Sequence, residues 1–141
     1  MLRAASEADL GEFARWEEAN SSGALWSLSD LQQEFTHPSS TMLVAVDGAA
    51  LLGYAVIREM PDGFELLNIL VRSDRRRLGT GGTLMQGIHE RAGGQSVYLE
   101  LRASNEAAAA LYEGYGYMQV GLRERYYSDG EDAVLLMRLA E

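Results

Sequence analysis

The sequence of 141 residues predicts an α/β fold in one domain, residues 1–141, with a mixed, mostly antiparallel sheet of about seven strands and four helices. The main observation is the order of the patterns along the chain: strand, two helices, three strands, helix, strand, helix and two strands. A second observation is the composition. A hydrophobic fraction of 47%, with 9% aromatic residues, is enough for a single compact core.

The first third of the chain predicts a short strand and two helices. Residues 2–5 form the strand, and Ser6 caps a helix whose apolar residues recur at helical spacing: Leu10, Phe13 and Trp16. A capping box over residues 29–32 predicts the start of the second helix, which His37-Pro38 ends. Trp26 lies between the helices, where it either fills the core or lines a substrate cleft.

The rest of the chain predicts six strands and two helices. Strands over 41–46 and 51–57 are joined by Asp47-Gly48, a strong hairpin signal, and a third strand covers 64–71. A helix then ends at Gly93-Gly94. The next strand, 96–102, follows a strand–helix crossover, so we expect it to be parallel to 64–71, central and covered. The remaining elements are a helix over 106–113, capped by Ser104-Asn105, and a hairpin of strands 117–123 and 133–139.

A Gly-rich turn between strand 64–71 and the following helix predicts an anion site. Glycines let the backbone approach a ligand, and the free N–H groups and dipole of a helix N-terminus favour negative charge. All twelve basic residues are arginines, and four of them lie directly before the turn: Arg72, Arg75, Arg76 and Arg77. A phosphate or pyrophosphate fits this pattern, although a solvated loop that starts an ordinary helix remains an alternative.

Composition excludes several classes of function. A net charge of −9 disfavours nucleic acid and favours a cationic partner. The chain has no cysteine, and its two histidines, His37 and His89, lack neighbours at ligand spacing, so we expect no metal. No apolar run approaches eighteen residues and the N-terminus has no signal-peptide core, so we expect no membrane contact and a cytoplasmic protein.

Two stretches carry a resemblance to a known family. The spelling Arg76-x-x-Gly79-x-Gly81 after a strand resembles the coenzyme A pyrophosphate loop of the GNAT family of N-acetyltransferases. Residues 98–108 and 110–117, with the pair Tyr126-Tyr127, are similar to the RimI-type enzymes of that family, which acetylate the N-terminal alanine of a small-subunit ribosomal protein. The resemblance implies the GNAT fold, with a splayed parallel strand pair at the cofactor site.

The resemblance also implies roles for individual residues, with acetyl-CoA as cosubstrate and a basic protein or peptide N-terminus as acceptor. Glu100 matches the general base and Tyr112 the general acid. The expected cofactor contacts are Ile69, Leu70, Val71, Arg76, Arg77, Leu78, Gly79, Thr80, Gly81, Gly82 and Asn105. The expected contacts of the acceptor are Trp26, Arg125, Tyr126 and Tyr127.

The chemistry of amine acetylation fits these roles. A protonated amine cannot attack a thioester, and a carboxylate on a covered strand has its pKa raised by desolvation toward a useful value. Removing the proton from lysine, with a pKa of about 10.4, costs roughly 3.5 kcal/mol more at neutral pH than from an N-terminal amine at about 7.7 to 8.0, which favours the N-terminal acceptor.

Alternatives remain open for the residues and for the function. Glu100 could instead form a structural charge pair with Arg102 or a neighbouring strand, and Tyr112 could be a core residue. An acetyltransferase of the same fold acting on lysine or a small amine, and a CoA-binding module without catalysis, are the other candidate functions.

Overall fold

The computed structural model describes residues 1–20, 26–76 and 78–140, and the predicted order of elements is confirmed. The elements are β1 (Leu2–Ala4), α1 (Leu10–Ala19), α2 (Leu28–Phe35), β2 (Ser40–Asp47), β3 (Ala50–Met60), β4 (Gly63–Val71), α3 (Thr80–Ala92), β5 (Val97–Arg102), α4 (Glu106–Gly114), β6 (Met118–Arg123) and β7 (Ala133–Arg138). Short 3-10 helices at Glu7–Asp9 and Ser73–Arg75 precede α1 and α3.

The strands form one seven-stranded sheet in the order β1-β2-β3-β4-β5-β7-β6. Neighbouring strands are antiparallel except β4 and β5, which are parallel as predicted because α3 connects them. The strand β5 lies inside the sheet between β4 and β7, and its alternate residues Val97 and Leu99 are buried.

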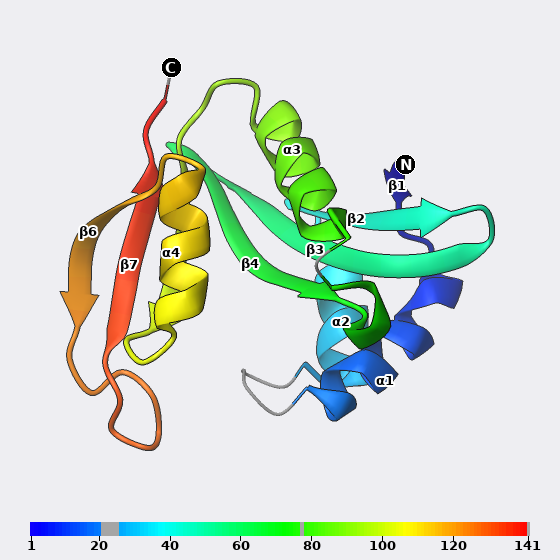
Figure 1. Cartoon of the computed structure of the whole chain (residues 1–141), viewed down its shortest axis with the longest axis horizontal. Coiled ribbons are helices and arrows are strands. Elements are labelled where there is room, and N and C mark those ends of the chain that lie inside the picture. Colours follow the sequence, from blue (N-terminus) through cyan, green and yellow to red (C-terminus); the bar gives the residue numbers. More distant parts are fainter. Residues whose placement is uncertain (21–25, 77, 141) are drawn as a thin grey trace.

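Helices cover both faces of the β1–β4 half of the sheet. Figure 1 shows α3 on one side of this half and α1 and α2 on the other. The α3 side has a core that includes Leu84, Ile88 and Leu99 and continues under α4. On the opposite side, Leu10 and Phe13 of α1 are buried, as their helical spacing predicts, together with other apolar residues of α2 and the sheet.

The parallel strands β4 and β5 separate soon after they meet. They pair only at Phe64–Val97 and Glu65–Tyr98. Beyond these positions β4 continues along β3, and β5 continues along β7. The β5-facing edge of β4 is therefore open from Leu66 onward, which forms the splayed pair that the family resemblance implies.

A β-bulge changes which face of β4 each side chain occupies. Val56 of β3 pairs with Asn68, whereas the next residue, Ile57, pairs with Leu66, so one residue of β4 is extra. Before the bulge Leu66 packs in the α3-side core, and after it Leu70 packs in the α1-side core. The bulge thus turns Asn68 toward α1, a direction that strict alternation from Leu66 does not give.

The start of α2 differs from the predicted capping box. Ser27, not Ser29, is the N-cap: its hydroxyl accepts a hydrogen bond from Asp30 N at 3.1 Å, and the Asp30 carboxylate accepts one from Ser27 N at 2.9 Å. Both serines precede a suitable partner by three residues, so the spacing alone cannot choose between them. The choice made places Leu31 fully in the core.

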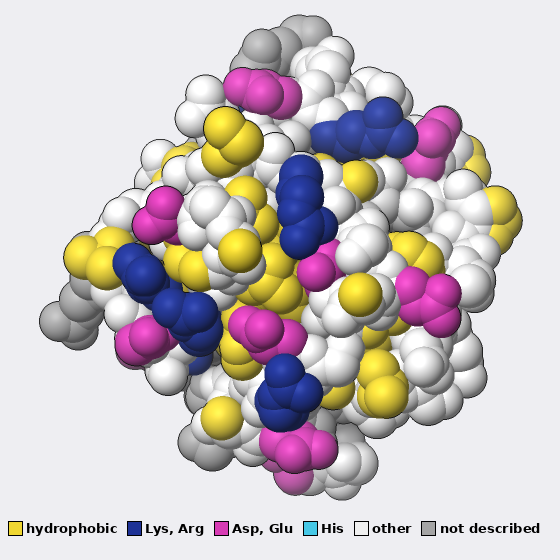
Figure 2. All heavy atoms as spheres, turned by 90° about the vertical axis from the view of Figure 1, so that its right-hand side faces the viewer, with side chains coloured by type: hydrophobic (Ala, Val, Ile, Leu, Met, Phe, Trp, Pro, Cys, Tyr) yellow, Lys and Arg dark blue, Asp and Glu magenta, His cyan; other side chains and the backbone are white. Residues whose placement is uncertain are grey.

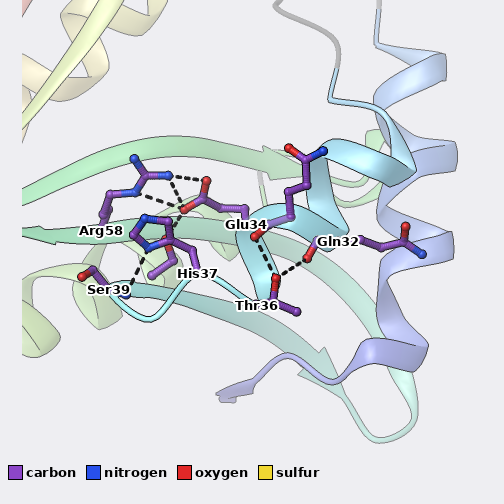
Figure 3. Close-up of polar contacts among 8 residues, drawn as sticks. Gln32, Glu34, Thr36, His37, Ser39 and Arg58 are labelled. Atoms are coloured by element: carbon purple, nitrogen blue, oxygen red, sulfur yellow. Dashed lines mark hydrogen bonds and ion pairs between the residues drawn. The ribbon is translucent and has the colours of Figure 1, made fainter.

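At the other end of α2, Glu34 anchors the helix to the sheet. Figure 3 shows its carboxylate pointing at the guanidinium of Arg58 on β3, and the closest oxygen lies 2.5 Å from Nη2. Ser40 donates a further hydrogen bond to Glu34. Burial alone would raise the pKa of Glu34, but the hydrogen bonds from Arg58 and Ser40 outweigh it and hold the pKa below its ordinary value.

Charges of both signs alternate on the surface near β1 and α1. Figure 2, which views the right-hand side of Figure 1, shows arginines beside acidic side chains around patches of apolar surface. Ion pairs of this kind include Arg3–Asp9 and Arg72–Asp74. In each pair one side chain is largely exposed, namely Arg3 and Asp74, while its partner is more covered. In the part of the chain that the structure describes, no helix is long and apolar enough to cross a membrane.

Candidate active site

A cavity of about 430 Å³ lies where β4 and β5 separate. Its walls come from both strands, from α4 and from the residues around the end of α1. Nine of the residues predicted for the site line it: Trp26, Ile69, Leu70, Val71, Arg76, Glu100, Asn105, Tyr112 and Tyr127. Residues expected to contact the cofactor, to contact the acceptor and to transfer protons thus line the same cavity.

Glu100 lies on β5, on the sheet face opposite Leu99 and Leu101. Its side chain is 19% exposed, and its Oε1 lies 3.3 Å from Arg123 Nε on β6. Of the structural charge pairs considered for Glu100, the one with Arg102 does not occur, because Arg102 binds Asp129 and Glu131 instead. A charge pair with another strand of the sheet does occur, through Arg123. The carboxylate therefore has a cationic neighbour on one side and the cavity on the other.

Tyr112 enters the cavity from α4. It is 6% exposed and packs edge-on against Tyr117, with ring centroids 5.5 Å apart, so it belongs to the core and lines the cavity as well. Burial raises the pKa of the Tyr112 hydroxyl to about 12. The hydroxyl therefore keeps its proton throughout the neutral range.

The predicted anion loop forms the start of α3. Gly79 is the N-cap and has a φ of 87°, a left-handed conformation that favours glycine, and no side chain caps the helix. A Cβ on Gly81 would lie 3.9 Å from Val71 Cγ2, and one on Gly82 would lie 3.1 Å from the Tyr115 hydroxyl. The first turn of α3 thus lies beside the strand end that forms the cavity wall, with its N–H groups uncapped by side chains.

The remaining residues of this loop have different surroundings. Leu78 is 67% exposed, and Thr80 is buried in the first turn of α3. Arg77 lies outside the described residues. Leu78, Gly79, Thr80, Gly81 and Gly82 do not line the cavity; they follow it along the chain.

The arginines before α3 are not equivalent. Arg72 is held by Asp74 at 2.6 Å and by the Leu51 carbonyl at 2.9 Å. Arg76 donates from Nε to the Val71 carbonyl at 3.2 Å and lines the cavity. It also lines a second cavity of about 340 Å³ that shares Asn20, Leu70 and Val71 with the first. Among the described arginines before α3, Arg76 is therefore the one that lines the first cavity.

Asn105 combines two positions. Its side-chain oxygen accepts a hydrogen bond from Ala108 N at 3.3 Å, which caps α4 as predicted, and the residue also lines the cavity opposite β4. The cap fixes where α4 begins and so where Tyr112 enters the cavity.

The four residues predicted to contact the acceptor divide into two pairs. Trp26 and Tyr127 line the cavity. Trp26 also packs against the α1-side core, as one of its two interpretations predicted. Arg125 and Tyr126 lie outside the cavity wall: Arg125 has a φ of 51° and donates its N–H to Asp132, and Tyr126 is 53% exposed with its ring 5.2 Å from that of Tyr127.

A hydrogen-bonded group at the α1 side of the cavity was not predicted. Glu17, which is 2% exposed, accepts hydrogen bonds from the Tyr54 hydroxyl at 2.7 Å and from Asn68 Nδ2 at 3.0 Å. Glu17 and Asn68 line the cavity. One signal for it was available: Glu17 lies seven residues after Leu10, which places a carboxylate on the buried face of α1.

Among residues 1–20, 26–76 and 78–140, no group of three or more His, Asp or Glu side chains is arranged to hold a metal ion.

Comparison with known proteins assigns the family. Residues 9–117 match the model of the Acetyltransferase (GNAT) family. The chain belongs to this family of acetyltransferases. It is also 36% identical over 118 residues to the N-alpha-acetyltransferase RimI of Mycobacterium tuberculosis, a match that covers 80% of this chain and 75% of that protein.

Two further comparisons concern proteins from Escherichia coli. The chain is 35% identical over 94 residues to the ribosomal protein bS18-alanine N-acetyltransferase of strain K12, covering 63% of this chain and 64% of that protein. The crystal structure of the ribosomal-protein-S18-alanine N-acetyltransferase superposes with a TM-score of 0.87 at 27% identity, covering 99% of this chain and 92% of that one. The GNAT fold predicted from the sequence is thus confirmed.

Proposed function

We propose that this acetyltransferase transfers the acetyl group of acetyl-CoA to the N-terminal α-amine of a protein. The observation that carries the proposal is the single cavity in which Glu100 and Tyr112 meet beside the open edge of β4. The relatives named as N-alpha-acetyltransferases support this choice of acceptor.

The residues of the chain fit acetyl-CoA. The β5-facing edge of β4 lacks a strand partner from Leu66 onward, so the backbone of Ile69, Leu70 and Val71 is available to an extended arm that carries amide groups. The uncapped N–H groups of α3 follow beyond Val71 and suit a pyrophosphate, with Arg76 between the two. The cosubstrate supplies an acetyl group already activated as a thioester.

Glu100 and Tyr112 handle the two protons of the reaction. Glu100 takes the proton that the amine loses as its nitrogen forms the new C–N bond, either directly or through a water molecule. Tyr112, protonated at neutral pH because burial raises its pKa, donates a proton to the sulfur as the C–S bond breaks. Glu100 enters from β5 and Tyr112 from α4, so the two side chains approach the cavity from different elements.

The acceptor that the chain suits best is a basic N-terminus. The net charge of the enzyme, −9, attracts a cationic peptide. Trp26 and Tyr127 offer aromatic surface at the acceptor side, and Arg125 and Tyr126 lie nearby in the β6–β7 connection. With the names of the relatives, this favours an N-terminal alanine of a small-subunit ribosomal protein.

The test uses two basic peptides and mass spectrometry. One peptide has a free N-terminal alanine and no lysine, and the other has a blocked N-terminus and one lysine. Acetylation of the first peptide alone is the expected result. Acetylation of the second peptide alone would mean that the acceptor is a lysine side chain. Acetylation of neither peptide would contradict a peptide acceptor.

A further inference from the structure

The group formed by Glu17, Tyr54 and Asn68 has a defined direction of hydrogen bonding. Asn68 Nδ2 lies 3.0 Å from Glu17 Oε2 and 2.9 Å from the Tyr54 hydroxyl oxygen. The Tyr54 hydroxyl lies 2.7 Å from the same Glu17 oxygen. A carboxylate only accepts hydrogen bonds, so Tyr54 must donate its proton to Glu17 and accept one from Asn68.

The surroundings of Tyr54 keep it in this donor role. Its ring is fully buried and stacks on Phe13 of α1, with centroids 4.2 Å apart and planes 6° from parallel. Burial first, and then the negative charge of Glu17, raise the pKa of the Tyr54 hydroxyl far above its ordinary value. The hydroxyl therefore retains the proton that it donates to Glu17.

This arrangement decides the orientation of the Asn68 amide. Its Nδ2 lies within hydrogen-bond distance of both Glu17 and Tyr54, and these two oxygens lie on one side of the nitrogen because they are themselves hydrogen-bonded to each other. Turning the amide over would place its oxygen against the Glu17 carboxylate, which has no hydrogen to donate. The network thus fixes the nitrogen toward α1 and does not use the oxygen of the side chain.

Asn68 lines the cavity, and the hydrogen bonds that its side chain makes within the described part of the chain use Nδ2 and not Oδ1. The β-bulge before Asn68 puts it on the same face of the sheet as Glu100, which alternates with the buried Leu99 on β5. Asn68 and Glu100 therefore lie on one face of the sheet and line the same cavity.

We propose that Asn68 Oδ1 accepts a hydrogen bond from the acceptor, at its amine or at its first peptide N–H, and that Glu17 is the positioning residue that holds this oxygen in place. The inference rests on the proposed function, because it assigns the residue that orients the amine of the peptide toward Glu100. Tyr54 completes the network without contacting the acceptor.

Steady-state kinetics with the free N-terminal alanine peptide test the proposal. Asn68→Ala removes the oxygen, so we expect the KM for the peptide to rise about tenfold, the worth of one hydrogen bond to an amine. The KM for acetyl-CoA remains that of the wild type, because the side chain of Asn68 faces α1 and the backbone of β4 is unchanged.

A double variant separates positioning from direct contact. In Glu17→Gln an amide can donate as well as accept, so Asn68 is free to turn over, and the KM for the peptide rises less than in Asn68→Ala. Because Glu17 acts through Asn68, we expect the double variant Glu17→Gln/Asn68→Ala to have the same KM for the peptide as Asn68→Ala alone. A double variant in which the two increases in KM multiply would overturn the positioning role of Glu17.

Glu34→Gln is the matched control. Figure 3 shows this carboxylate held by Arg58 at the far end of α2, and it does not line the cavity. Its loss lowers the melting temperature but leaves both KM values unchanged, so a rise in peptide KM cannot be ascribed to lower stability. If Asn68→Ala does not fold, Asn68→Ser serves the same test, because the shorter serine hydroxyl cannot take the places of both the amide nitrogen and the amide oxygen.

The outcomes distinguish this inference from the function beneath it. If the wild-type enzyme acetylates the peptide and Asn68→Ala has the same KM for the peptide as the wild type, the inference is overturned and the proposed function stands. A rise in both KM values and a fall in melting temperature to the same degree as in the control would also overturn it, in favour of a structural role. Wild-type enzyme inactive on the peptide overturns the proposed function and the inference together.

Discussion

At the scale of single residues, the two groups assigned to proton transfer have different surroundings. Glu100 has a charged neighbour, Arg123, whereas Tyr112 lies among aromatic and aliphatic side chains. The sequence suggested both residues through the family resemblance alone. What it could not supply was the partner of Glu100, since Arg102 and Arg123 both lie on neighbouring parts of the sheet and only the register decides between them.

The first prediction concerns Tyr112 and pH. Burial raises its pKa to about 12, so the proton needed by the leaving sulfur is present at every pH below about 11. We expect kcat to show no decline between pH 8 and 10 that depends on Tyr112, and Tyr112→Phe to lower kcat by about 100-fold across that range. Stopped assays of peptide acetylation at each pH make the measurement.

Tyr117 supplies the control for this prediction. It packs against Tyr112 and is equally part of the core, but it does not line the cavity. Its hydroxyl bonds His89 at 2.9 Å, so Tyr117→Phe loses a hydrogen bond and keeps its kcat. A decline in the kcat of the wild type near pH 10 that is absent from Tyr112→Phe would mean that Tyr112 has the ordinary pKa of tyrosine. This result would contradict the raised pKa assigned to it.

At the scale of elements, glycine chemistry predicted the start and end of α3, whereas the bulge in β4 had no signal. Gly79 and Gly93 both have positive φ and bound the helix as the sequence indicated. By contrast, the run from Phe64 to Val71 is almost wholly apolar, so it has no alternation that could reveal an extra residue. Asn68 was therefore missed as a site residue.

Replacing Gly79 tests the role of the α3 turn. A Cβ there meets no atom within 4 Å, so Gly79→Ala acts through its φ of 87° alone. We expect the free energy of unfolding to fall by about 1–2 kcal/mol, the cost of a left-handed conformation, and the KM for acetyl-CoA to rise as the first N–H groups of α3 move. Urea denaturation and steady-state kinetics measure the two effects.

Gly114→Ala is the matched substitution. Its Cβ also meets nothing within 4 Å, but Gly114 lies in α4 and has no positive φ. We expect it to be neutral or to stabilise the protein by up to about 1 kcal/mol, because alanine favours a helix. Equal behaviour of the two variants would mean that the left-handed turn before α3 is not required for cofactor binding.

At the scale of the whole molecule, the candidate active site lies where two parts of the sheet diverge. The order of elements was predictable because each has its own local signals, and the parallel relation of β4 and β5 followed from the helix between them. The cavity itself was not predictable from spacing, since its walls join residues from Glu17 to Tyr127. Only the resemblance to a family brought Glu100 and Tyr112 together in advance.

Single-turnover acetylation by Glu100→Gln is the most direct test of acetyl transfer in this cavity. The change keeps the size of the side chain but removes the group that takes the proton, so we expect the rate on the N-terminal alanine peptide to fall at least about 100-fold, with acetyl-CoA binding unchanged. Glu113→Gln, on the exposed face of α4, retains the wild-type rate. A Glu100→Gln enzyme as fast as the wild type at pH 7 would contradict the assignment of Glu100 as the base.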